Sequence, residues 1–286
     1  MILITGATGQ LGTAVVTQLL RQSALGKFTL FVRDRSKAQA YIDQGIPVRV
    51  GDFDDPASLP QAFAGISKLL LISSRSIDRA RQQKQVVDAA VHAGVRHIVY
   101  TGLAIQDIAT SHTNALMQSH FDTEAHIRAS GVAYTFLRNT MYADALPEII
   151  GEGWSRHGIN LPGGDGQVPY ALRREMGEAT ANLLLQDDHA MRTYDITGRG
   201  SHTYLDVADA LGSLTGQTVS YTDISEQAFA QHLQAAGLPD FLIYLSTSTV
   251  RDVKDHQYEL RSDALRKLLG REPAGLEQMI KEVFAL

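Results

Sequence analysis

The sequence predicts an α/β fold built on a doubly wound parallel sheet. Over residues 1–140, short runs rich in Ile, Leu, Val and Phe alternate with segments whose apolar residues recur at helical spacing. The runs show little alternation of polar and apolar residues, which is typical of strands that are buried on both faces. Strands that alternate with helices are joined in parallel, so we expect helices on both faces of the sheet.

The expected elements follow one another in order. Strands are expected at 1–5, 28–33, 46–50, 68–73, 95–101 and 132–138, and helices at 11–23, 56–64, 79–93 and 114–130. After a Gly/Pro-rich stretch at 158–172, helices are expected at 173–186, 203–216, 225–237, 262–269 and 275–284, with strands at 192–197 and 217–224. We therefore expect a Rossmann-type α/β domain at 1–145 and a smaller α+β lobe at 146–286, whose strand near 192–197 returns to the main sheet.

The composition of the 286 residues excludes several classes of protein. Lys and Arg number 26 against 31 Asp and Glu, a net charge of −5, so no chain-wide basic surface for nucleic acid exists. The lack of cysteine excludes thiolate catalysis and disulfides. The apolar start at Met1–Ile4 is too short for a signal peptide or a membrane span. We expect a cytoplasmic protein without a membrane partner and, because no HxxxH or HExxH pattern occurs, without a metal.

A glycine-rich turn joins the first expected strand to the first expected helix. Its residues are Gly6, Ala7, Thr8, Gly9, Gln10, Leu11 and Gly12. Glycines at such a junction allow a tight turn, let backbone N–H groups approach a diphosphate and let the helix pack close to the strand. The positive end of the helix then faces the phosphates. A purely structural turn is the alternative, but this position in a Rossmann-type pattern predicts a dinucleotide site.

The end of the second expected strand selects the nucleotide. Arg33 stands where an acidic residue would bind the 2′-hydroxyl of NADH, and Arg35 is close by. Two guanidinium groups favour a 2′-phosphate, although Asp34 keeps the hydroxyl alternative open. We expect NADPH, with NADH as the alternative.

Short segments along nearly the whole chain carry a family likeness. They are GATGQLG at 6–12, VRD at 32–34, GDFDDP at 51–56, LLLISS at 69–74, GVRHIVYTG at 94–102, HFDTE at 120–124, YTFLRN at 134–139, GLPD at 237–240 and LRKLLG at 265–270. Together they resemble the NmrA-like group of atypical short-chain dehydrogenases/reductases, and within it the bacterial NAD(P)H:quinone oxidoreductases and triphenylmethane reductases.

The resemblance implies further cofactor contacts. The residues implied are Asp52, Phe53, Ser73, Ser74, Arg75, Leu137, Arg138, Asn139, Thr140, Met141, Tyr142 and Arg173. Asp52 and Phe53 would flank the adenine, and residues 137–142 would approach the nicotinamide. Local roles are the alternatives: Asp52 could cap the helix near Pro56, the serines could cap the helix after residue 78, and Phe53 could belong to the core.

The proton donor of the wider superfamily is missing. That donor is a Tyr followed four residues later by Lys, and none of the ten tyrosines has this partner; Tyr134 is followed by Arg138 instead. His120 and Glu124, one helical turn apart, stand in its place. They are either a dyad in which His120 relays a proton near neutral pH or a pair that only stabilises the helix.

An enzyme without that donor suits particular acceptors. Hydride added to a ketone yields a basic alkoxide that needs a matched acid, whereas a reduced quinone is a delocalised anion that water can protonate. We expect a reductase of quinones or similar electron-poor acceptors, acting as a monomer or homodimer. Candidates for an apolar acceptor slot are Met141, Tyr142, Phe241, Tyr244, Leu103 and Ile105. A non-catalytic NADP(H) sensor and a dye or nitro-aromatic reductase are the alternatives.

Overall fold

A parallel sheet of seven strands forms the centre of the molecule. The computed structural model describes residues 1–74 and 76–286. The strands lie in the order β3-β2-β1-β4-β5-β6-β8 and neighbouring strands are parallel. Their bounds are β1 Ile2–Ile4, β2 Phe28–Val32, β3 Val48–Val50, β4 Lys68–Leu71, β5 His97–Leu103, β6 Ala133–Asn139 and β8 Arg192–Ile196. The direction of winding reverses between β1 and β4, as the predicted doubly wound fold requires.

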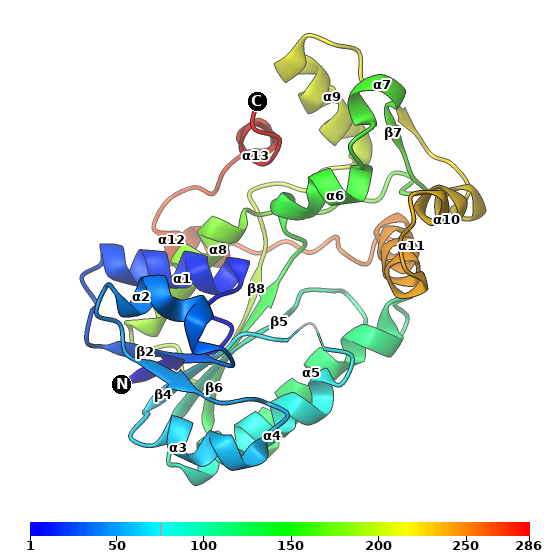
Figure 1. Cartoon of the computed structure of the whole chain (residues 1–286). Coiled ribbons are helices and arrows are strands. Elements are labelled where there is room, and N and C mark those ends of the chain that lie inside the picture. Colours follow the sequence, from blue (N-terminus) through cyan, green and yellow to red (C-terminus); the bar gives the residue numbers. More distant parts are fainter. Residues whose placement is uncertain (75) are drawn as a thin grey trace.

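Helices cover both faces of this sheet (Figure 1). One face carries α1 Gln10–Arg21, α2 Gln39–Ile42, α8 Arg173–Leu184 and α12 Ala264–Leu269, and the other carries α3 Leu59–Phe63, α4 Arg79–His92 and α5 Asn114–Ala129. Three short 3-10 helices, η1 Arg35–Ala38, η2 Pro56–Ser58 and η3 Ala143–Ala145, follow strands β2, β3 and β6.

Alternate strand residues enter two separate cores. Ile4, Leu70 and Leu137 pack under α1 and α8, while Leu3 and Phe136 pack under α4 and α5. Both sets are almost completely buried, which explains why the strand sequences show no polar alternation. Each such side chain contributes about 1.5–3 kcal/mol on burial.

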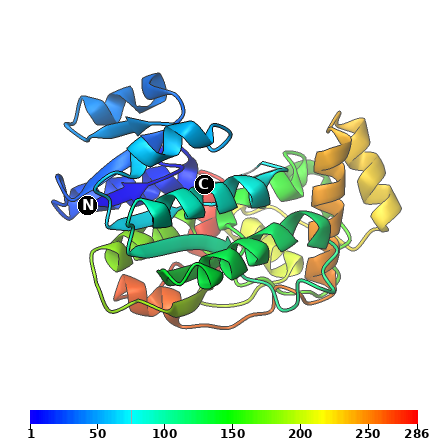
Figure 2. The same cartoon turned by 90° about the horizontal axis from the view of Figure 1, so that it is seen from below.

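The remaining elements form a lobe at one end of the sheet. They are α6 Leu146–Ile150, α7 Trp154–His157, β7 Ile159–Asn160, α9 Tyr204–Thr215, β9 Tyr221–Thr222, α10 Glu226–Ala235, α11 Asp240–Lys254 and α13 Leu276–Val283. A third apolar cluster that includes Tyr170, Tyr204 and Val253 holds them together. Figure 2 shows α10 and α11, in gold and orange, projecting at the end away from the N-terminus.

The segment after residue 145 is shared between sheet and lobe. It supplies β8, paired with β6, and also α8, which packs against α1. The expected strand at 217–224 is only the two-residue β9, and α11 was not among the expected helices. The division at residue 145 therefore stays a prediction. In the described part of the chain, no helix is long and apolar enough to cross a membrane.

Candidate active site

Many of the residues expected at the site lie at the carboxyl edge, meaning the residues directly after the strands. In open α/β sheets a ligand binds at this edge where the strand order reverses. Here that point lies between β1 and β4. The cofactor end of the edge comprises residues 6–12 and 33–35, and the acceptor end comprises Leu103 and residues 139–142.

The glycine turn has the geometry of a phosphate cradle. Gly6 has a φ of +62°, which few other residues adopt. A Cβ on Gly12 would lie 2.1 Å from the carbonyl oxygen of Gly6, so only glycine allows α1 to start this close to β1. Gly9 is the N-cap of α1 and offers no side chain to cap it. Within the described residues, the N–H groups of Gln10 and Leu11 have no acceptor, so they are open to an anion.

The end of β2 presents two exposed arginines beside a carboxylate that is already engaged. Arg33 and Arg35 are exposed. One oxygen of Asp34 accepts hydrogen bonds from the backbone N–H and the hydroxyl of Ser36, at 2.9 and 2.6 Å. These bonds hold the pKa of Asp34 below its usual value. Asp34 thus caps η1, and the two arginines remain for a phosphate.

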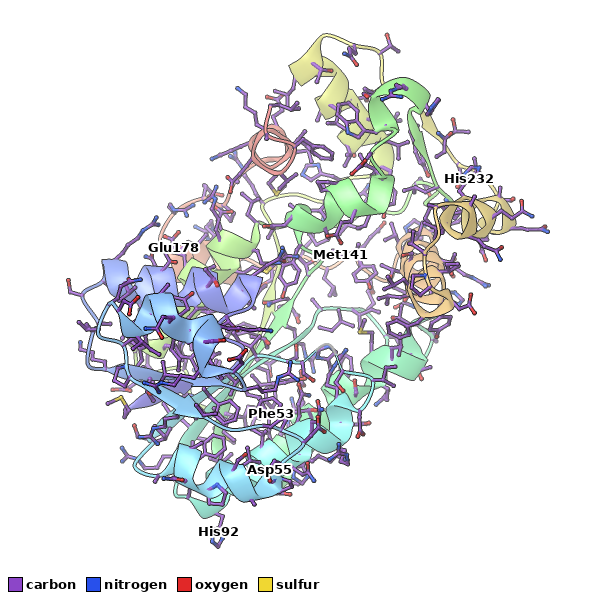
Figure 3. The ribbon with its side chains drawn as sticks, viewed as in Figure 1. Phe53, Asp55, His92, Met141, Glu178 and His232 are labelled. Atoms are coloured by element: carbon purple, nitrogen blue, oxygen red, sulfur yellow. The ribbon has the colours of Figure 1, made fainter. Side chains whose placement is uncertain are left out.

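The loop after β3 places Asp52 and Phe53 near the cofactor end. Asp52 accepts a bond from the backbone of Asp54 at 3.1 Å, and Asp55 caps η2. The alternative that Asp52 caps this helix is therefore wrong. Phe53 is partly exposed and stacks on Phe31 with ring centroids 5.5 Å apart, beside α3 and α4 (Figure 3).

Ser73 and Ser74 follow β4 at the carboxyl edge. The backbone N–H of Ser74 donates to Gln83 Oε1 at 3.3 Å. Asp78 occupies the N-cap of α4, so the alternative that these serines cap that helix is wrong. Arg75, expected to contact the cofactor, lies outside the described residues.

The segment after β6 connects the main sheet to the lobe. The side-chain amide of Asn139 donates to the Tyr142 hydroxyl at 3.3 Å, and the Arg173 guanidinium lies 4.5 Å from the centre of the Tyr142 ring. Burial raises the pKa of Tyr142, so its phenol stays protonated at neutral pH. Arg173 and Gln10 also line a hollow of about 380 Å³ between α1 and α8.

The rest of this segment is more buried. Leu137 and Thr140 are 1% and 4% exposed, and Leu137 belongs to the core under α1. The side chain of Leu137 can therefore touch a ligand only at its margin.

The expected pairing of His120 with Glu124 is wrong. Glu124, 1% exposed, instead accepts two bonds from the Arg138 guanidinium, at 2.9 and 2.7 Å. Arg138 projects from β6 on the side of α5, opposite Leu137 and Asn139, because successive strand residues alternate. The guanidinium expected near the nicotinamide is thus held in an ion pair with the buried Glu124.

His120 is also unsuited to relay a proton near neutral pH. It is 7% exposed, and its Nε2 lies against the Arg79 guanidinium while its Nδ1 lies 2.9 Å from the Tyr100 hydroxyl. Burial and the neighbouring Arg79 lower the pKa of His120 to about 3. Because Arg79 can only donate, Nε2 must accept, and the neutral ring carries its proton on Nδ1.

The expected slot residues are only partly brought together. Leu103 pairs with Asn139 in the sheet, and Met141 lies below α6 (Figure 3), so both belong to the acceptor end. Ile105 is 6% exposed and packs in the core of the lobe. Phe241 and Tyr244 lie on α11 and are each 40% exposed. The Tyr244 hydroxyl donates to the carbonyl of His112 at 3.0 Å.

Sequence reasoning missed a polar cluster between α4 and α5. It comprises Arg79, Gln83, Tyr100, His120 and Thr123. The only signal was the presence of Gln82-Gln83 on the apolar face of an expected helix. Such residues indicate a buried hydrogen-bond network when they occur at core positions.

Comparison with known proteins agrees with this architecture. The model of the NmrA-like family matches residues 1–268. The chain belongs to the NmrA-like family. It is 35% identical over 291 residues to quinone oxidoreductase 2 of Escherichia coli, covering 99% of each chain.

Two solved structures resemble the whole chain. The NADPH-dependent quinone oxidoreductase of Escherichia coli complexed with NADPH has a TM-score of 0.91 and 34% identity, covering 99% of this chain and 100% of that one. The Citrobacter triphenylmethane reductase complexed with NADP(H) has a TM-score of 0.91 and 33% identity, covering 99% of each chain. The resemblance inferred from the short motifs is confirmed.

Proposed function

We propose that this protein is an NADPH-dependent reductase that transfers hydride to a quinone or a similar electron-poor conjugated acceptor. The observation that carries this proposal is the glycine turn, whose open N–H groups meet the carboxyl edge at the reversal of strand order. The names of the relatives, a quinone oxidoreductase and a triphenylmethane reductase with NADP(H), support the same chemistry.

Preference for NADPH rests on the end of β2. Arg33 and Arg35 are exposed, and Asp34 is held by Ser36. A 2′-phosphate would gain charge-assisted hydrogen bonds from the arginines. A 2′-hydroxyl would have only the second oxygen of Asp34 to bind, because Ser36 already engages the first.

The choice of acceptor follows from the acids at the acceptor end. Bound NADPH supplies a hydride. The phenol of Tyr142 has a raised pKa and His120 is neutral with a pKa of about 3, so neither matches the proton demand of an alkoxide at neutral pH. The chain's own task is to orient the acceptor and exclude water. Acceptors whose reduced form water can protonate fit this site.

A coenzyme and acceptor panel tests the proposal. Stopped-flow oxidation of NADPH and NADH is followed with a benzoquinone, a naphthoquinone and a triphenylmethane dye, for the wild type and Arg33→Ala. We expect quinone turnover with NADPH, and a loss of about tenfold to 100-fold in kcat/KM for NADPH in the variant, since one charged hydrogen bond is worth roughly 1.5–3 kcal/mol. Rates with NADH should not change.

Arg96→Ala is the matched control, because Arg96 is exposed just before β5 at the opposite edge of the sheet. NADPH binding without turnover of any acceptor would favour the sensor alternative. Turnover of the dye alone would favour a dye reductase.

The partner we propose is thus a small-molecule acceptor, handled in the cytoplasm. A chain without cysteine fits that reducing compartment. We propose that the protein acts as a monomer or as a homodimer.

A further inference from the structure

Arg79 is a partly buried cation in the first turn of α4. Residues 72–78 join β4 to α4, so this first turn stands beside the carboxyl edge before the helix runs back along the sheet. The guanidinium points toward α5, where it contacts His120 Nε2 and lies 3.9 Å from Met117 Sδ. It is therefore placed between two helices, next to the strand ends.

No carboxylate neutralises this cation within the described part of the chain. Its hydrogen-bond partners are a neutral imidazole and a thioether, and Nε is buried without any partner. Desolvation lowers the pKa of Arg79, while the group remains charged at neutral pH. Residue 75, which the structure does not describe, is an arginine and so adds no carboxylate.

The surrounding cluster holds the guanidinium in place. His120 receives its bond on Nε2 and approaches the Tyr100 hydroxyl through Nδ1. Gln83 donates to that hydroxyl at 3.1 Å and to Thr123 at 2.8 Å, and its Oε1 accepts from the backbone N–H of Ser74. The cluster thus ties Arg79 to the end of β4.

The cluster that holds Arg79 includes Tyr100 on β5, the same strand that ends at Leu103 in the acceptor end. Leu103, which pairs with Asn139, is three residues beyond Tyr100 on β5, roughly 10 Å by strand rise. A flat acceptor that rests on the 139–142 segment would have its far edge on the side of α4 and α5. The Nη2 group of Arg79, for which the described residues offer no partner, would meet that edge.

We propose that Arg79 binds the oxygen on which negative charge gathers when the acceptor takes up hydride. This inference rests on the proposed function and narrows it to acceptors that become anionic or carry an anionic group. A buried cation is costly unless an anion compensates it, and developing charge on an acceptor oxygen supplies that anion. Cationic triphenylmethane dyes would be disfavoured in the same place.

The reaction balances without a protein acid. When NADPH is bound, the C4–H bond of its nicotinamide would break, leaving NADP⁺, and the hydride would form an O–H bond on one quinone oxygen, so that the quinone becomes the hydroquinone monoanion with its charge on the other oxygen. Water then donates the proton that gives the neutral hydroquinone. The guanidinium stays protonated throughout and binds the anionic oxygen by hydrogen bonds.

Arg79→Gln and Arg79→Lys test this role, with Lys84→Gln as the control. Lys84 is exposed on the same helix. For Arg79→Gln we expect kcat/KM to fall about 100-fold with a neutral naphthoquinone, the usual effect of losing one oxyanion donor. A sulfonated naphthoquinone should lose at least as much, and a cationic triphenylmethane dye should lose nothing. Arg79→Lys should recover part of the rate, and the affinity for NADPH should not change.

A binding measurement separates this inference from the proposed function. Calorimetry follows naphthalene-2-sulfonate, an unreactive flat anion, binding to the NADP⁺-loaded wild type and to Arg79→Lys and Arg79→Gln. We expect binding that weakens about tenfold or more in Arg79→Gln, in line with a lost charged hydrogen bond. If Arg79→Gln does not fold, the wild type should still bind the sulfonate and reject a naphthalene that carries a trimethylammonium group.

The outcomes are distinct. The inference would be overturned if Arg79→Gln lost equal factors of kcat/KM for the quinone and for the cationic dye, or if sulfonate binding did not depend on Arg79. In either case, quinone turnover by the wild type would leave the proposed function standing. Sulfonate binding through Arg79 without turnover of any acceptor would support the anion site and count against the reductase.

Discussion

The two ends of the carboxyl edge are made in different ways. The phosphate cradle of the cofactor end is built from main-chain groups of one short segment, in which Gly6 and Gly12 allow the approach of α1 to β1. The acceptor end and the polar cluster between α4 and α5 are built from side chains that come from β5, α4, α5 and the segment after β6. A local motif thus encodes the first end, whereas only the folded chain assembles the second.

Loss of the Glu124 carboxylate should have the largest effect, and it acts between α5 and β6. Glu124→Gln leaves the partly exposed Arg138 guanidinium without its hydrogen-bonded counter-charge. We expect the free energy of unfolding to fall by about 3 kcal/mol, the lower end of the range for broken buried ion pairs, because only Glu124 is fully buried. Urea unfolding of Glu124→Gln and of the exposed control Glu148→Gln measures this. A loss below about 1 kcal/mol would mean that the pair behaves like a surface pair.

A methyl group on Gly12 should damage the cofactor end. The new Cβ of Gly12→Ala would meet the main chain of residues 6 and 7, so α1 must move away from the turn. We expect the affinity for NADPH to fall about 100-fold, or roughly 2.7 kcal/mol. Calorimetry compares it with Gly275→Ala, whose Cβ would point into open space. Unchanged affinity in Gly12→Ala would show that the diphosphate binds elsewhere.

Acid should lower the free energy of unfolding through His120, which lies in the polar cluster between α4 and α5. Its pKa is about 3 in the folded protein against an ordinary value near 6.5, so the unfolded chain binds the proton more readily. The contribution of neutral His120 to the free energy of unfolding is therefore complete above pH 6.5. It is lost as the pH falls toward 3, by up to about 1.4 kcal/mol per pH unit. His97, with a pKa of about 4, acts in the same direction.

Unfolding by urea between pH 7 and pH 4 measures this slope. In His120→Gln the slope should be smaller, whereas His126→Gln on the same helix should keep it. Equal slopes in both variants would contradict the buried neutral state of His120.

The same difference between local motifs and long-range contacts explains which parts of the structure could be predicted from the sequence. The seven strands of the main sheet and the glycine turn follow from local patterns, and the structure contains them. Helix α11 was missed because its Ser246–Val250 stretch is rich in Ser and β-branched residues, which have low helix propensity. Tertiary contacts stabilise it: the buried Asp252 accepts bonds from Ser111 and from the backbone of His112.

The site divides in the same way. Spacing alone suggested that His120 pairs with Glu124, but the partner of Glu124 is Arg138 on a strand, and that of His120 is Arg79 on another helix. Pairings between residues far apart in sequence leave no local signal. Arg79 itself could not be singled out, because an arginine at a helix start is ordinarily a solvated charge.

One single-turnover experiment tests the central claim most directly. The protein is loaded with NADPH that carries deuterium at the transferred position of C4 and is mixed in a stopped-flow instrument with a naphthoquinone. The account predicts that one quinone is reduced per NADPH, that the deuterium leaves the nicotinamide, and that the reaction is slower than with ordinary NADPH. Tight binding of NADPH that is never oxidised by any quinone would contradict it.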